Sequence, residues 1–226
     1  MVIVSDELIH QLRNVLRFNV SEKMILCDNT GYEYEVEVSE ISKNEIVGKL
    51  IEKRLNAVEP KLRIALYVGL LKSPERFEFI LQKATEVGVT EFIPLLTERT
   101  EKLSLNKIDR MKRILKEAAE QSGRGVIPVL KEPAKLKDLF KSLVNEDEVN
   151  LFATPEAEMS LRRAINKISK ADKINLFVGP EGGFTKKEVF EAEEHGMTTF
   201  HLEKRILRTE TAAIVIPAVL LSILGQ

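Results

Sequence analysis

The spacing of apolar and charged side chains divides the chain near residue 65. In Tyr32–Val38, tyrosine and valine alternate with three glutamates, and this period of two is typical of a half-buried strand. In Leu8–Leu16, leucine and valine recur at helical spacing. The first part of the chain is therefore predicted to be a small β-rich unit, which ends in a linker at Asn56–Pro60.

Beyond this linker the apolar runs become continuous. Arg63–Leu71 lacks alternation, which is typical of a strand covered on both faces. Ser73, Pro74 and Gly88 then mark the start and the end of a helix, and Thr185–Glu188 is a capping box that starts a later helix. Strands that alternate with helices predict an α/β fold with a mainly parallel sheet. We place the domains at residues 1–66 and 67–226.

Composition restricts the classes of protein to consider. Among 226 residues, 34 are Lys or Arg and 35 are Asp or Glu, so any surface for nucleic acid must be local. Arg99–Lys137 has eleven basic and five acidic residues, and it is either a solvated helix face or a phosphate-binding face. With one cysteine and three histidines, a disulfide framework and a zinc site on paired cysteines are excluded, and no metal site is predicted.

No signal peptide and no membrane span are expected. The first residues lack a basic region followed by a long apolar stretch. The longest apolar run, Ala212–Leu221, is too short to cross a bilayer. We therefore predict a soluble, cytoplasmic protein.

The first segment with candidate chemistry is Gly179–Thr185, a turn with three glycines and one proline between a buried strand and a capped helix. Ligands of open α/β sheets bind just beyond the carboxyl ends of strands, and glycine lets them approach the backbone closely. The alternative is a tight turn without a ligand. Glu181 favours a site, because a carboxylate among apolar neighbours usually binds or reacts.

The second segment is Leu202–Ala212, which also follows a strand and precedes a helix, with Arg208–Thr211 at the start of that helix. We expect it to lie beside the Gly179 turn, with Thr209 or Thr211 as the cap of the helix. A helix N-terminus presents free N–H groups that favour negative charge. A capped helix with a surface Arg–Glu pair is the alternative interpretation.

Further candidates are less specific. Arg13 and Arg17 share one face of the first predicted helix and could contact phosphates, although these residues alone favour a plain polar face over the small β unit. Gln82–Val89 and Glu117–Arg124 have the pattern of ordinary amphipathic helices that end at glycine.

Taken together, these motifs resemble those of one family. The chain is similar to the ribosomal RNA small subunit methyltransferase E family, the uridine-N3 methyltransferases of the SPOUT superfamily. GPEGGFT at 179–185 and RILRTETA at 205–212 are the most specific motifs. QKATEVGV, EAAEQSGR and HQLRNVLR occur upstream, so the resemblance runs from His10 to the C-terminus.

The resemblance implies a fold, a cofactor and a substrate. The fold is α/β: a C-terminal SPOUT domain, with a mainly parallel sheet and a trefoil knot, follows a small PUA-like β-barrel that helps to bind RNA. The implied enzyme is a homodimer that uses S-adenosylmethionine to methylate N3 of a uridine in 16S ribosomal RNA, either free or in the small ribosomal subunit.

The resemblance also implies which residues form the site. The expected cofactor-binding residues lie in the two motif loops and after one earlier strand: Thr154, Gly179, Pro180, Glu181, Gly182, Leu202, Glu203, Ile206, Leu207, Thr209 and Thr211. The expected RNA-binding residues are all cations: Arg13, Arg17, Lys72, Arg76, Arg99 and Arg124. Glu203 departs from the family, which is expected to have glycine at this position.

Methylation at N3 sets two chemical requirements. The N3 proton must be accepted by a base, and positive charge must stabilise the anion that develops on the uracil oxygens. Arg208 is the candidate for the charge, and Glu210 or Glu181 is the candidate proton acceptor. Either carboxylate could instead hold an arginine or a backbone N–H in place.

Three other functions remain open at this stage. One is a SPOUT methyltransferase that acts on another RNA or another base atom. The second is an RNA-binding relative without catalysis, against which the intact Glu181 and Arg208 argue. The third, a nucleotide-dependent metabolic enzyme, rests on architecture alone.

Overall fold

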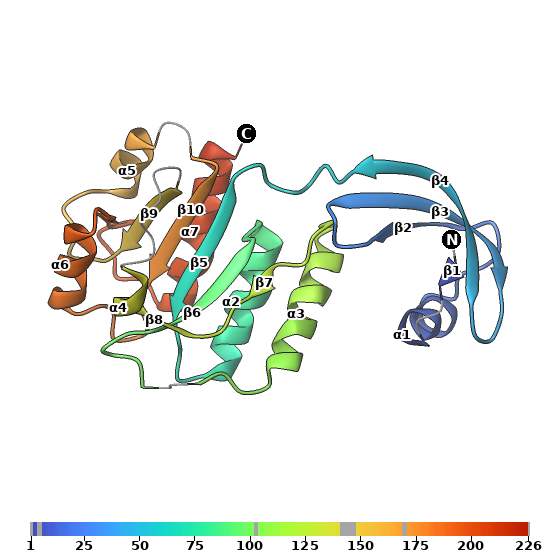
Figure 1. Ribbon diagram of the computed structural model, residues 1–226, viewed down its shortest axis with the longest axis horizontal. Helices are drawn as coiled ribbons and strands as arrows, with labels where there is room; N and C mark the ends of the chain where they lie inside the picture. The colour runs from blue at the N-terminus through green and yellow to red at the C-terminus, as the bar shows by residue number, and fades with distance from the viewer. Residues whose placement is uncertain (1, 4–5, 102–103, 141–147, 169–170, 226) are drawn as a thin grey trace. The chain divides into compact units, whose positions relative to one another are not determined.

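The computed structural model describes the whole chain except residues 1, 4–5, 102–103, 141–147, 169–170 and 226 (Figure 1). Contacts within the chain define two compact units. The first contains Met1–Glu59 and Gly123–Val126, and the second contains Pro60–Ser122 and Ile127–Gln226. The boundary predicted at residue 66 falls inside a strand of the second unit, Arg63–Gly69.

The N-terminal unit is an antiparallel sheet in the order β1-β4-β3-β2. Its elements are β1 (Val2–Ile3), α1 (Asp6–His10), η1 (Gln11–Val15), β2 (Lys23–Cys27), β3 (Tyr32–Ile41) and β4 (Ile46–Leu55). In β3, Val36 and Val38 are buried against Leu12, whereas the intervening glutamates are partly exposed, as the alternation predicted. The single helix predicted over residues 8–16 is instead an α-helix followed by a π-helical turn.

The segment predicted as a linker is anchored within the N-terminal unit. Asn56 is 5% exposed, and its Nδ2 atom donates to the backbone oxygen of Gly123 at 2.9 Å and to Glu33 at 3.0 Å. The guanidinium of Arg124 pairs with Glu59 at 3.0 Å. A distant piece of chain, Gly123–Val126, therefore completes this unit.

The second unit is built on a parallel sheet in the order β11-β9-β10-β5-β6-β7, with β8 also paired to β6. All of its recorded strand pairs are parallel, which confirms the predicted mainly parallel α/β sheet. The strands are β5 (Arg63–Gly69), β6 (Glu91–Leu96), β7 (Val129–Leu130), β8 (Ala134–Lys135), β9 (Glu148–Ala153), β10 (Lys173–Val178) and β11 (Thr198–Phe200).

Helices cover both faces of this sheet. Leu66 and Leu176 belong to the core beneath α2, α3, α5 and α7, whereas Tyr67 and Phe177 face the other way, into the core beneath α4 and α6. The side chains on β5 are buried on both faces, as its continuous apolar run predicted, and those on β10 are buried as well. The helices are α2 (Pro74–Val87), α3 (Ile108–Gln121), α4 (Leu136–Leu139), α5 (Leu161–Lys167), α6 (Lys186–Glu194) and α7 (Thr209–Leu224).

Local signals set most helix ends. Ser73 accepts the N–H of Arg76 at the start of α2, and Gly88 ends it in the left-handed conformation at φ 118°. Thr185 and Glu188 form the predicted capping box of α6. The expected threonine cap of α7 is wrong, because the cap position belongs to Arg208 and no side chain caps the helix there.

The path after β10 brings the two motif loops together. The chain leaves Val178, forms α6, and enters β11 at the edge of the sheet beside β9. It then returns as α7, which packs against α2, β5 and β10. The trefoil knot is expected in this part of the chain. Among the described residues, no helix is both long enough and apolar enough to span a membrane.

Candidate active site

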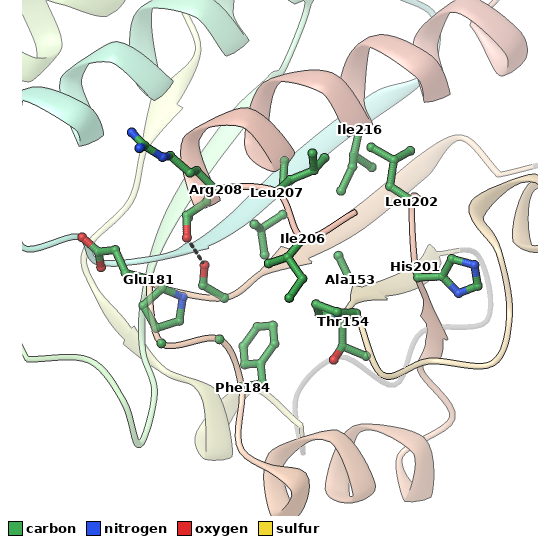
Figure 2. Close-up of a pocket in the computed structure, with 18 of the residues that line it drawn as sticks. Ala153, Thr154, Glu181, Phe184, His201, Leu202, Ile206, Leu207, Arg208 and Ile216 are labelled. Atoms are coloured by element: carbon green, nitrogen blue, oxygen red, sulfur yellow. Dashed lines mark hydrogen bonds between the residues drawn. The ribbon is translucent and has the colours of Figure 1, made fainter. Parts of the chain in front are cut away.

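A cavity of about 600 Å³ opens at the carboxyl ends of β9, β10 and β11. It is lined by the loops that follow these three strands and by the first turns of α7 (Figure 2). This volume lies in the range of small-molecule sites. The sequence predicted a pocket between the two motif loops, and the structure contains one there.

The cavity has two polar ends and an apolar middle. Figure 2 shows Glu181 and Arg208 at one end and Thr154 and His201 at the other. Ile206, Leu207 and Phe184 lie between them. Ile206 is 83% exposed, so a large apolar side chain faces the open pocket and is available to cover a ligand.

A buried hydrogen bond joins the two motif loops. The Thr209 hydroxyl donates to the backbone oxygen of Gly179 at 3.0 Å. Thr209 is 7% exposed, so this bond is shielded from water. Thr209 therefore links the start of α7 to the glycine turn instead of capping its helix.

The glycine turn rests on a glycine of the neighbouring strand. A Cβ on Gly69, the last residue of β5, would lie 2.3 Å from the nitrogen and 2.5 Å from the Cδ of Pro180. Only a residue without a side chain lets Pro180 pack there. The sequence does not mark Gly69, because within an apolar run its context looks like that of any other strand residue.

Glu181 is held by a backbone group. One of its carboxylate oxygens accepts the N–H of Lys72 at 3.1 Å. The Lys72 ammonium pairs with Glu101 at 2.8 Å, and that partner is the main cause that raises the pKa of Lys72. Glu181 thereby ties the glycine turn to the loop after β5.

Glu210, unlike Glu181, accepts no hydrogen bond from a described residue at its buried carboxylate oxygen. Its side chain is 14% exposed, and Oε1 lies 3.9 Å from Nε of Arg76. Oε2 is buried, and no group in the described part of the chain hydrogen-bonds to it. A buried carboxylate oxygen without a donor is costly, so a donor from a ligand would stabilise it.

Arg208 supplies a cation at the same end of the cavity. The residue is exposed and lines the pocket. None of the described side chains forms an ion pair or a hydrogen bond with its guanidinium. The charge is therefore available to an anionic group that enters the cavity.

The far end of the cavity contains a carboxylate that sequence analysis missed. Glu156 lines the pocket, and the Thr154 hydroxyl donates to it. This hydrogen bond is the main cause that lowers the pKa of Glu156, with Arg99 and Lys186 as lesser causes. Glu156 follows β9 by three residues, but no motif marked it.

The structure brings most of the predicted cofactor residues together. Thr211 is exposed on α7 and lies outside the cavity. The other predicted cofactor residues all line it: Thr154, Gly179, Pro180, Glu181, Gly182, Leu202, Glu203, Ile206, Leu207 and Thr209. Glu203 stands where glycine was expected from the family resemblance. Its Oε2 atom lies 3.8 Å from Nη2 of Arg205, so the two side chains form an ion pair.

The predicted RNA contacts fall into three groups. Arg76 and Arg99 line the cavity. Lys72 does not line it, but its backbone N–H donates to Glu181, which does. Arg13 and Arg17 are exposed in the N-terminal unit. Arg124 does not fit the prediction, because its side chain is 3% exposed and paired with Glu59.

Among the described residues, no group of three or more histidine, cysteine, aspartate or glutamate side chains could hold a metal ion.

Comparisons with known proteins agree with this architecture. A family model described as an RNA methyltransferase domain matches residues 58–221, and one described as an RNA methyltransferase PUA domain matches residues 4–51. Ribosomal RNA small subunit methyltransferase E from Mesomycoplasma hyopneumoniae is 35% identical over 210 residues, which cover 90% of this chain and 87% of that protein. The Bacillus subtilis protein of the same name is 31% identical over 220 residues, covering 93% and 86%.

This chain belongs to the ribosomal RNA small subunit methyltransferase E family. The predicted family is therefore confirmed, as is the fold class of a SPOUT domain preceded by a PUA domain.

Solved structures of two relatives extend the comparison. The Neisseria gonorrhoeae methyltransferase E, bound to S-adenosylmethionine, has a TM-score of 0.87 at 29% identity and covers 99% of this chain and 91% of its own. A Legionella pneumophila methyltransferase, also with bound S-adenosylmethionine, has a TM-score of 0.82 at 28% identity, with coverage of 99% and 92%.

Proposed function

We propose that this protein transfers the methyl group of S-adenosylmethionine to N3 of a uridine in 16S ribosomal RNA of the small subunit. Family membership supports methyl transfer to small-subunit ribosomal RNA. The observation that supports methylation at N3 is the buried Oε2 of Glu210, a residue that lines the cavity beside Arg208. None of the described residues donates a hydrogen bond to this oxygen. N3 is a ring N–H in uridine, and Oε2 can accept its hydrogen bond and then its proton.

The cavity fits S-adenosylmethionine in size and in chemistry. The glycine turn lets an adenosine approach the backbone closely, and the apolar middle formed by Ile206, Leu207 and Phe184 suits an aromatic base. When bound, this cofactor supplies an electrophilic methyl group on a sulfonium. We assign its binding to both motif loops and to Thr154, and we add Glu156 as an acceptor for hydroxyl or ammonium hydrogens.

Glu210 is the better proton acceptor of the two candidates. Glu181 already accepts the N–H of Lys72, which gives it a positioning role. In the proposed reaction Glu210 would accept the N3 proton, and S-adenosylmethionine held by the two motif loops would supply the methyl group that N3 gains. No further reactant is needed to balance this step.

Arg208 would stabilise the uracil anion. Loss of the N3 proton spreads negative charge over the two carbonyl oxygens of the base. Arg208 lines the same end of the cavity, and its guanidinium has no ion-pair partner among the described residues. Charge placed in advance, where charge develops, lowers the barrier without reorganisation.

The RNA would reach the cavity across a cationic rim. Arg76 and Arg205 line the cavity, the side chain of Arg205 is 80% exposed, and the backbone N–H of Lys72 hydrogen-bonds to the lining residue Glu181. The uridine must leave its stack to enter. We further propose that Arg13 and Arg17 bind phosphates through the N-terminal unit. The implied homodimer also remains a prediction; α7 exposes Val215 and Ile223.

Calorimetric titration with S-adenosylmethionine tests the proposed cofactor site. We expect saturable binding by the purified chain. Absence of binding, both alone and with small-subunit RNA present, would contradict the proposal. Binding by the chain would leave only the RNA target to be determined.

Replacement of Arg17 by glycine should raise the stability of the protein and lower its affinity for RNA. Arg17 has a φ of 56°, in the left-handed region that suits glycine, where it ends the first helical segment. Arg17→Gly should therefore stabilise the protein by about 0.5–1 kcal/mol. It should also weaken RNA binding severalfold, because one phosphate contact is lost.

Arg17→Ala is the matched control, since it removes the charge but keeps the strained backbone. It should weaken RNA binding equally without the gain in stability, and both variants should bind cofactor normally. Chemical denaturation and RNA titration at several salt concentrations provide the readouts. Unchanged RNA affinity in both variants would exclude this contact.

A further inference from the structure

We propose that Arg99 is a positioning residue that sets the conformation of the cofactor turn, instead of an RNA contact. This inference rests on the proposed function, because it concerns the same cavity. Nη1 of Arg99 donates to the backbone oxygens of Gly182 at 2.6 Å and of Phe184 at 3.2 Å. The side chain comes from the loop after β6, which is distant in sequence from the turn.

Each carbonyl group that Arg99 binds shares a peptide unit with the N–H group of the next residue. Because a peptide unit is planar, fixing the Gly182 carbonyl fixes the N–H of Gly183, and fixing the Phe184 carbonyl fixes the N–H of Thr185. The Gly183 N–H donates to the oxygen of Pro180 at 2.8 Å. The Thr185 N–H donates to Glu188 at 2.8 Å. Arg99 thus stabilises both the closure of the turn and the capping box of α6.

The close packing of Arg99 against Gly182 is a second observation that supports the same role. A Cβ on Gly182 would lie 3.3 Å from both Cβ and Cδ of Arg99. The aliphatic stem of the arginine therefore lies against the bare Cα of the glycine. Gly182 leaves space for the arginine as well as for a ligand.

The loop that carries Arg99 is itself held in place. The Thr97 N–H donates to the hydroxyl of Thr100 at 2.9 Å, and the Thr100 N–H donates to the oxygen of Thr97 at 3.1 Å. The Glu98 N–H donates to Glu188 at 2.8 Å, and Glu188 is 5% exposed. Arg99 is therefore presented from a fixed base, and the loop after β6 acts as a support for the cofactor turn.

Affinity measurements on Arg99→Ala and Arg99→Lys test this role. Arg99→Ala should weaken S-adenosylmethionine binding about tenfold, raise the cofactor KM similarly, and change kcat at saturating cofactor less than threefold. Affinity for small-subunit RNA without cofactor should stay within about twofold. Arg99→Lys should recover part of the cofactor affinity, because an ammonium can donate to one of the two carbonyls.

Arg163→Ala removes an exposed arginine of α5 outside the cavity and is the matched control. The rise in denaturation midpoint on adding cofactor, measured for each variant from its own midpoint without cofactor, should shrink for Arg99→Ala, shrink less for Arg99→Lys and stay unchanged for Arg163→Ala. Loss of RNA affinity with normal cofactor affinity would overturn the inference. If the unaltered chain itself failed to bind cofactor, the proposed function would fail instead.

Discussion

Glu210→Gln should lower kcat for RNA methylation by about 100- to 10,000-fold, the range typical of losing a general base. Glutamine keeps the size of the side chain but cannot take the N3 proton. Cofactor affinity should change less than twofold, because the proposed role concerns the uridine. Methyl incorporation into small-subunit RNA at saturating cofactor measures the effect.

The pH dependence of the Glu210→Gln variant gives a second check. Its residual activity should rise as the pH is raised, because bulk hydroxide then removes the proton that the carboxylate no longer accepts. Glu181→Gln serves as the comparison. We expect it to keep kcat and cofactor affinity close to those of the unaltered enzyme, because the amide oxygen of glutamine can still accept the Lys72 N–H that ties the glycine turn to the loop after β5. A kcat within threefold of the unaltered enzyme for Glu210→Gln would remove Glu210 from the chemistry.

Gly69→Ala should weaken cofactor binding at least tenfold and destabilise the fold. The added methyl would meet the Pro180 nitrogen at 2.3 Å, and a backbone atom cannot move away as a flexible side chain can. Overpacking of this kind costs about 1–3 kcal/mol. Because Pro180 opens the glycine turn, we expect the turn to shift and the cofactor Kd to rise at least tenfold.

Gly196→Ala separates this effect from the general cost of replacing glycine. Gly196 has a φ of 76°, and a Cβ there would meet nothing within 4 Å. This variant should lose about 1 kcal/mol of stability through backbone strain but bind cofactor normally. Calorimetric titration and chemical denaturation on both variants provide the comparison. Normal cofactor affinity in a folded Gly69→Ala protein would show that the turn does not depend on this contact.

Local sequence signals predicted the framework of the site well. A serine, a proline and a glycine fixed the ends of α2, and the capping box fixed the start of α6, because each signal acts within a few residues. Parallel strands place their carboxyl ends at one edge, so the two motif loops could be expected to meet. The hydrogen bond from the Thr209 hydroxyl to the Gly179 oxygen joins the two loops directly.

Sequence could not reveal partners that are distant along the chain. Arg124 looked like a surface cation, but it pairs with Glu59, 65 residues away. Arg99 reaches Gly182 across 83 residues. A charged residue has the same sequence signature whether it faces RNA, a carboxylate or a backbone carbonyl, and only the tertiary structure distinguishes these cases. Gly69 and Glu156 were missed for the same reason.

Nucleoside analysis of the RNA product tests the central claim most directly. Small ribosomal subunits that lack the modification are incubated with the protein and S-adenosylmethionine, and the RNA is digested and its methylated nucleosides are identified and mapped. The account predicts one N3-methyluridine in 16S ribosomal RNA, strongly reduced with the Glu210→Gln variant. Methylation of another base or of a ribose, or no methylation despite cofactor binding, would contradict it.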